Sequence, residues 1–306
     1  MGYRIGLEIE AYGLNGNEMK EIVESVGGTF GGLFGYHDRS GRNPRTADCG
    51  GYYDEKIDGP HFYVSRDGSL HSMPDMKWDE KGSFELVCPI LYGEKGLAML
   101  SKICTRMQRA GAWVDSTCGT HINMGVAHLG RVQAMSDRNK MEIGRRVCEI
   151  YSHFQPVFDA LSPNCRRTDN NPFPGNGVCR TSAPFRGRCV VNMLSLHNFI
   201  MGGRIEFRQP GFTLDFKKIL GWVRLLNSVL TCAINEQHSN FRVPASNFTP
   251  NLEGMVEMLN PGVRAARWAD GRIRHMITTF TRFRDERMQA IGTSANAAEW
   301  SHLGVA

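Results

Sequence analysis

The stretch Tyr3-Arg4-Ile5-Gly6-Leu7-Glu8-Ile9-Glu10 alternates strictly between apolar and other residues. Successive side chains of a β-strand point to opposite faces of a sheet, so the three apolar side chains share one face while Glu8 and Glu10 share the other. This pattern is typical of a half-buried strand. The chain is therefore expected to contain a sheet with carboxylates on its polar face.

Further strands are predicted where apolar runs end at turn or breaker residues, namely at residues 61–65, 83–88, 118–124, 189–195 and 204–210. Helices are predicted at residues 18–26, at 97–107, at 137–161 with a bend at Pro156, after a cap at Asp215, and in a basic segment at 270–291. A glycine-rich stretch at 27–35 precedes a polar loop that runs to about residue 59.

The predicted strands and helices interleave without a regular β-α-β cadence, and several strands alternate polar with apolar residues. This arrangement favours an α+β fold, with an antiparallel β-sheet, helices packed on one face and the active site on the other. We expect a catalytic domain at residues 1–240 and a mostly helical C-terminal extension at 241–306.

The composition is that of an ordinary globular protein, with 306 residues, 41% of them hydrophobic and 22% charged. There is no apolar run of membrane-spanning length and no secretory signal at Met1, so we expect a cytoplasmic protein with no membrane partner. The nine cysteines contain no Cys-x-x-Cys pair and are expected to be reduced and mostly buried. The net charge of +5 would help to attract an anionic substrate but does not by itself indicate nucleic-acid binding.

The polar faces of the predicted strands carry residues suited to metal and phosphate chemistry: Glu8, Glu10, Glu85, His121, Asn123, Glu206 and Arg208. Two carboxylates about 4 Å apart repel each other by about 4 kcal/mol at an effective dielectric constant near 20, so such a cluster needs cations. Oxygen-rich sites of this kind suit Mg²⁺ or Mn²⁺.

Each of these residues also has an ordinary structural interpretation. Glu8 and Glu10 could lie on a solvated face, His121 could be a structural histidine, and Glu206 with Arg208 could be a surface ion pair. Polar residues suited to metal binding recur on the same face of several predicted strands, however, and this recurrence favours a functional site. A loop at residues 162–188 adds five arginines against the single acid Asp169, which indicates an anion-binding role; the arginines are Arg166, Arg167, Arg180, Arg186 and Arg188.

Five short motifs occur in an order that resembles the amidoligase family, a group of glutamine synthetase-like carboxylate-amine ligases. They are Ile5-Gly6-Leu7-Glu8-Ile9-Glu10, Ser65-Arg66-Asp67-Gly68-Ser69-Leu70, Phe84-Glu85-Leu86-Val87-Cys88-Pro89, Cys118-Gly119-Thr120-His121-Ile122-Asn123 and Arg204-Ile205-Glu206-Phe207-Arg208 with the following Thr213-Leu214-Asp215. The resemblance covers roughly residues 3–237. Cys88 departs from the small hydroxyl residue that the family often has before the proline.

The resemblance implies roles for these positions. Two or three divalent cations beside the ATP phosphates would be bound by Glu8, Glu10, Glu85, His121 and Glu206. Arg208 would contact the transferring phosphoryl group, and the turn at Asp67 and Ser69 would lie on the substrate side. The nucleotide phosphates or the substrate carboxylate would be contacted by Arg166, Arg180, Arg186 and Arg188. Asn123 is predicted to lie on the nucleotide side of the site, as these arginines are.

The implied reaction joins a small-molecule or peptide carboxylate to an amine. The carboxylate attacks the γ-phosphorus of ATP to give an acyl phosphate and ADP, and the amine then displaces phosphate. Asp67 and Glu85 are both candidates for the general base. Three alternatives stay open: a small-molecule phosphotransferase on the same fold, a metal-dependent hydrolase, and a nucleic-acid-binding module. The last would use Arg264, Arg267, Arg272, Arg274, Arg282, Arg284 and Arg287.

Overall fold

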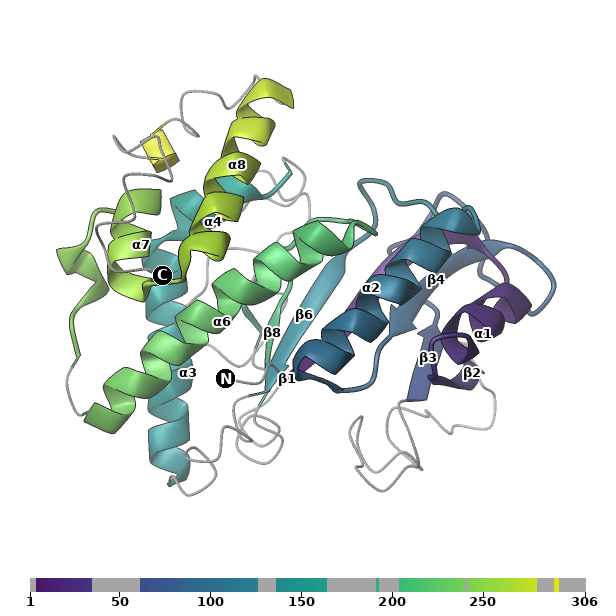
Figure 1. Ribbon diagram of the computed structural model, residues 1–306, viewed down its shortest axis with the longest axis horizontal. Helices are drawn as coiled ribbons and strands as arrows, with labels where there is room; N and C mark the ends of the chain where they lie inside the picture. The colour runs from purple at the N-terminus through teal and green to yellow at the C-terminus, as the bar shows by residue number, and fades with distance from the viewer. Residues whose placement is uncertain are drawn as a thin grey trace. The chain divides into compact units, whose positions relative to one another are not determined.

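The computed structural model describes residues 4–34, 61–125, 136–163, 191–192, 204–239, 242–279 and 289–291. The chain divides into two compact units, of which the first comprises Met1–Asn123 with Gly211–Ile219 and the second Met124–Pro210 with Leu220–Ala306 (Figure 1). No helix within the described ranges has both the length and the apolar character that a membrane crossing requires. The domain division predicted at residue 240 stays a prediction.

Strand β1, Arg4–Leu14, lies between β4 and β6 in the sheet of the first unit. Its apolar side chains are at most 1% exposed, which confirms the predicted alternation, but Glu10 on the opposite face is only 3% exposed. The expectation of a half-buried strand is therefore wrong, because β1 is central in the sheet and every residue of it except Arg4 and Glu8 is buried. Its register with β4 shifts between Tyr12 and Leu14, at Gly13, whose φ is +93°.

The strands of the first unit follow the order β2-β3-β4-β1-β6, and β5 also pairs with β1. They are β2 Thr29–Phe34, β3 His61–Ser65, β4 Gly82–Val87, β5 Leu91–Tyr92 and β6 Thr120–Gly125. β4 and β5 run antiparallel to β1, and β3 runs antiparallel to β4. The predicted α+β class is confirmed, with one departure: β2, in the glycine-rich stretch that predicted no strand, runs parallel to β3.

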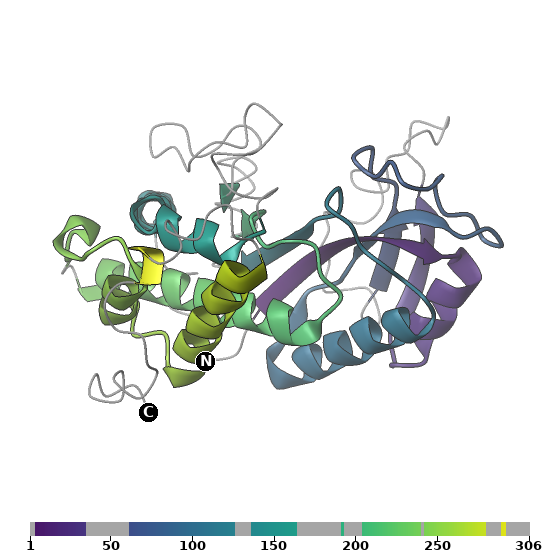
Figure 2. The same ribbon diagram turned by 90° about the horizontal axis from the view of Figure 1, so that it is seen from above.

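Helices α1, Gly16–Glu24, and α2, Gly93–Arg109, lie on the same face of this sheet (Figures 1 and 2). α1 begins two residues before its predicted start because Asn15 and Glu18 form a capping box, each side chain accepting from the other's backbone N–H at 2.9 Å. α2 buries the predicted apolar stripe, which consists of Leu97, Leu100, Ile103, Cys104 and Met107. The apolar face of β1 therefore has helical partners, and the carboxylate face is left for the site.

Five cysteines lie in the described part of the chain, and all are free: Cys88, Cys104, Cys118, Cys148 and Cys232. The first four are buried, as expected for reduced structural thiols. Burial raises the pKa of Cys104 to about 12, and burial together with the neighbouring Cys104 thiol raises the pKa of Cys88 well above its usual range. The other four cysteines of the sequence lie outside the described residues: Cys49, Cys165, Cys179 and Cys189.

We expect Cys88 and Cys104 to resist a short pulse of iodoacetamide at pH 8 in the folded chain and to react after unfolding in urea. The thiolate is the nucleophile, and a raised pKa together with burial removes both the thiolate and access to it. Mass spectrometry of the alkylated peptides measures the outcome. Rapid labelling of Cys104 under native conditions would show that α2 does not cover the sheet as described.

The second unit is mainly helical. Its elements are α3 Asp137–His153, α4 Gln155–Leu161, α6 Phe216–Ser239 from Leu220 onward, η2 Ala245–Asn247, α7 Leu252–Leu259, α8 Val263–Thr279 and the strands β7 Val191–Asn192 and β8 Arg204–Phe207. The single helix predicted at 137–161 is broken at Phe154, and Pro156 stands in the first turn of α4, where its missing N–H costs nothing. Asp215 caps α6 as predicted, accepting from Lys217 N at 2.9 Å.

Candidate functional site

Three carboxylates meet on the polar face of the first unit's sheet. Glu10 on β1 stands directly opposite Glu85 on β4, and Asp67 follows the end of β3. Each offers an oxygen, and these oxygens lie within 4.8 Å of one another. Glu10 and Glu85 are 3% and 4% exposed. The sequence predicted all three residues for the site, and the structure brings them together.

The Asp67 side chain is held by the turn that follows β3. Ser69 N donates to Asp67 Oδ1 at 2.6 Å, and Leu70 N donates to the Asp67 carbonyl at 3.3 Å. The neighbouring Arg66 points elsewhere, since its Nε pairs with Asp75 Oδ2 at 2.5 Å. Ser69, predicted on the substrate side, thus contributes its backbone to the geometry of Asp67.

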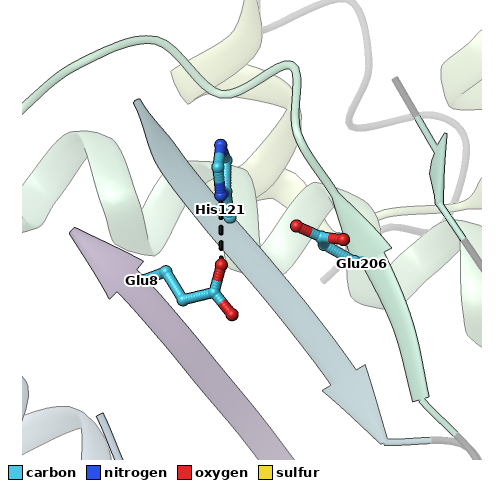
Figure 3. Close-up of side chains that lie close together, drawn as sticks. All are labelled: Glu8, His121 and Glu206. Carbon is cyan, nitrogen blue, oxygen red and sulfur yellow. Dashed lines mark hydrogen bonds and ion pairs between the residues drawn. The ribbon is translucent and has the colours of Figure 1, made fainter. Parts of the chain in front are cut away.

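His121 on β6 connects the two glutamates of β1. Its Nδ1 lies 3.1 Å from Glu8 Oε2 (Figure 3). Its Nε2 lies 3.8 Å from Glu10 Oε1. An ionised carboxylate only accepts, so Nδ1 carries the proton in the bond to Glu8. In a neutral ring Nε2 then keeps its lone pair, the state in which imidazole binds metals.

Asn123, two residues beyond His121 on the same face of β6, is 3% exposed. Its Oδ1 is buried and has no hydrogen-bond partner among the residues that the structure describes. A buried amide oxygen without a partner costs free energy, and such groups mark places where a ligand or water supplies the missing contact. Asn123 was predicted on the nucleotide side, and its buried oxygen fits a bound group.

The electrostatics of the three carboxylates favour a cation. At 4.8 Å, the upper limit of these separations, two unit charges repel each other by about 3.5 kcal/mol at an effective dielectric constant of 20. A divalent ion removes that repulsion, and a set of oxygen ligands is the kind that Mg²⁺ and Mn²⁺ prefer. The donor set of Glu10, Asp67 and Glu85 therefore fits the metals that the sequence predicts.

Glu206 and Arg208 belong to strand β8 and its continuation in the second unit. Arg208 Nη1 donates to Glu206 Oε1 at 2.6 Å, and the two side chains are 31% and 4% exposed. The surface ion pair considered above is therefore wrong for Glu206, whose carboxylate is buried; Figure 3 also draws this residue. Ile205 and Phe207 are fully buried, which confirms the prediction that these two side chains enter the core.

Other predicted site residues lie outside the described part of the chain, namely Arg166, Arg180, Arg186 and Arg188.

On α8, Arg274 Nε pairs with Asp270 at 3.0 Å and Arg272 Nε donates to the Leu161 carbonyl at 3.3 Å. Both contacts are structural. Arg282, Arg284 and Arg287 of the same basic segment lie outside the described residues.

Two residues that hydrogen-bond to the segment after Asp67 were not predicted, Tyr12 and Asp115. Tyr12 follows Glu8 and Glu10 at the same two-residue spacing, and this signal could have placed it on the site's face. Asp115 lies in the connection between α2 and β6, where nothing in the local sequence distinguishes it.

Comparison with protein families identifies the group of proteins to which the chain belongs. A family model described as "Putative amidoligase enzyme" matches residues 1–173, more than half of the chain. The chain belongs to the amidoligase family. Membership identifies it as a ligase-type enzyme, and the matched range contains Glu10, Asp67, Glu85 and His121 but ends before Glu206. No curated protein matches the chain.

Proposed function

We propose that this amidoligase-family protein is an ATP-dependent carboxylate-amine ligase that forms an amide bond through an acyl phosphate. The observation that carries the proposal is the group of three carboxylates on β1, β4 and the turn after β3, with ligand oxygens within 4.8 Å of one another. This group lies in the part of the chain that the family model matches. Its substrates would be a small-molecule or peptide carboxylate and an amine.

The proposed metal ligands are Glu8, Glu10, Glu85, His121 and Glu206, with Asp67 added on the geometry of the cluster, for two or three Mg²⁺ or Mn²⁺ ions. When bound, these ions would neutralise the negative charge of the ATP phosphates. His121 supports this role because its Nδ1 is already committed to Glu8, which orients the ring and leaves Nε2 facing Glu10.

Residues of the chain itself would bind and orient the reacting groups. The guanidinium of Arg208 is half-buried and paired with Glu206, and its planar fork is the group that would bind phosphoryl oxygens. Asn123 would donate or accept on the nucleotide side, with Arg166, Arg180, Arg186 and Arg188. Asp67 or Glu85 would take a proton from the attacking ammonium, which makes the amine nucleophilic.

We expect turnover to require Mg²⁺ or Mn²⁺ and to release ADP and inorganic phosphate, because an acyl phosphate route transfers the γ-phosphoryl group. Incubation with ATP, pooled carboxylates and hydroxylamine should yield a hydroxamate, which mass spectrometry detects. A chelator selective for zinc should leave turnover unchanged. AMP formed in step with the amide would contradict the acyl phosphate route, and a phosphorylated product without amide would favour the phosphotransferase.

A further inference from the structure

The turn that carries Asp67 continues into a segment whose backbone donates to a buried tyrosine hydroxyl. Tyr12 Oη lies 3.2 Å from the backbone N of His71 and 3.4 Å from that of Ser72. Tyr12 is fully buried. It stands two residues after Glu10 on the same strand face, so one strand supplies a carboxylate of the cluster and the anchor for the segment that supplies another.

A second group holds the same segment from the connection before β6. Asp115 Oδ2 accepts from Ser72 Oγ at 2.6 Å, and Asp115 Oδ1 accepts from Thr117 Oγ1 at 2.5 Å and from Thr117 N at 2.8 Å. Thr117 Oγ1 lies 2.6 Å from Tyr12 Oη, which closes the network. Three segments far apart in the sequence are joined through these hydrogen bonds.

The direction of every proton in the network follows from the carboxylate. An ionised Asp115 only accepts, so the hydroxyls of Ser72 and Thr117 both donate to it. The Thr117 oxygen then accepts from the Tyr12 hydroxyl, and the Tyr12 oxygen accepts from His71 N and Ser72 N. With these directions every hydrogen bond of the network can form at the same time.

Two further observations support a fixed, ionised anchor. Burial opposes the charge on Asp115, but hydrogen bonds from Ser72, Thr117 and Cys118 outweigh it, so the pKa of the Asp115 carboxyl lies below its usual value. Around the network, Tyr12 packs with Leu70 and Cys118 in a small apolar cluster completed by Met73, Val114 and Phe212. The segment that begins at Asp67 is therefore held by both polar and apolar contacts.

We infer that Tyr12 and Asp115 are positioning residues that hold Asp67 against Glu10 and Glu85 and thereby set the cation affinity of the three carboxylates. The inference rests on the proposed function, since it assumes that this cluster binds a divalent ion. Neither residue is a ligand in this scheme: both act through the segment from Asp67 to Ser72. Groups that orient metal ligands typically affect affinity by about 10- to 100-fold.

The test measures Mn²⁺ binding to the full chain by electron paramagnetic resonance, without nucleotide or substrate. Tyr12→Phe removes only the hydroxyl and should weaken Mn²⁺ binding by about 10-fold. Asp67→Asn should weaken binding as well, and the double variant should bind no more weakly than Asp67→Asn alone, because Tyr12 acts only through Asp67. Leu100→Val, in α2 on the other face of the sheet, is the control for a general loss of stability and should leave Mn²⁺ binding unchanged.

A milder variant keeps the test decisive if Tyr12→Phe does not fold. Ser72→Ala removes the one bond from Ser72 Oγ to Asp115 and should weaken Mn²⁺ binding by about fivefold, the equivalent of one hydrogen bond. Wild-type affinity in both Tyr12→Phe and Ser72→Ala, or losses that add in the double variant, would overturn the inference and leave the proposed function standing. Absence of Mn²⁺ binding to the unaltered chain would overturn both.

Discussion

Replacement of Glu85 by glutamine is expected to lower amide-forming turnover at least 10²-fold, equivalent to about 2.7 kcal/mol of transition-state stabilisation. The amide keeps the volume of the side chain but removes one of the three charges that face one another across β1, β4 and the Asp67 turn. Because Glu85 and Glu10 repel each other without a cation, the melting temperature of the variant should stay the same or rise. Loss of turnover with retained stability is the signature of a site residue.

The matched control for this change is Glu80→Gln, which also removes one negative charge from the first unit. Glu80 is 62% exposed and pairs with Lys77 at 2.7 Å, so its contribution is that of a surface ion pair. Initial rates of ADP release, with melting curves for each variant, decide the outcome. Wild-type turnover in Glu85→Gln would show that this carboxylate has no part in the chemistry.

Replacement of Phe207 by alanine should lower the free energy of unfolding by about 3–5 kcal/mol. The ring is fully buried on β8, and its centroid lies 5.8 Å from that of Tyr151, which stacks on Phe158 at 3.8 Å. Removing it leaves a cavity among aromatic rings that cannot close around the gap. Urea denaturation followed by fluorescence measures the loss.

The neighbouring residue provides the contrast. Arg208→Lys keeps the charge but loses the planar fork that grips two oxygens, so turnover should fall at least 10²-fold while stability changes by no more than about 0.5 kcal/mol. Opposite effects at adjacent positions would follow from the two faces of one strand. Equal losses of stability in both variants would instead assign Arg208 a structural role through its ion pair with Glu206.

The sequence predicts strands best where apolar and polar residues alternate over a long run. β1 was predicted in this way, β3 was predicted from a short apolar run that ends before a turn, and the α2 stripe followed from helical spacing. β2 was not predicted because its glycines are typical of turns, and its pairing with β3 depends on tertiary contacts that the local sequence does not encode. Pro156 is compatible both with a bent helix and with the first turn of a new helix, so the sequence predicted a bend where the structure has a break at Phe154.

The candidate site was predictable as a set of residue types but not as a set of contacts. Two-residue spacing placed Glu8 with Glu10 on one face, whereas the approach of Asp67 to Glu10 depends on how the segment after β3 is anchored. That anchor joins Tyr12, Asp115 and Ser72 across gaps of 43 to 60 residues, a distance over which periodicity carries no information. Sequence patterns identify faces, and tertiary hydrogen bonds decide which of the residues on a face meet.

The bulge at Gly13 has a consequence for how the length of the chain can vary during evolution. Because a strand has a period of two, one residue inserted or deleted between Ile5 and Tyr12 would turn the glutamates toward α1 and α2 and bring aliphatic side chains among the carboxylates. Gly13 is one extra residue of β1 relative to β4, and it comes after the last residue of this alternation. An added Cβ at this position would lie 2.9 Å from the Gly111 carbonyl oxygen. Insertions or deletions after Gly13 do not change the sheet face on which Glu10 lies. We therefore expect related chains to vary in length after this glycine and to keep a fixed number of residues before it.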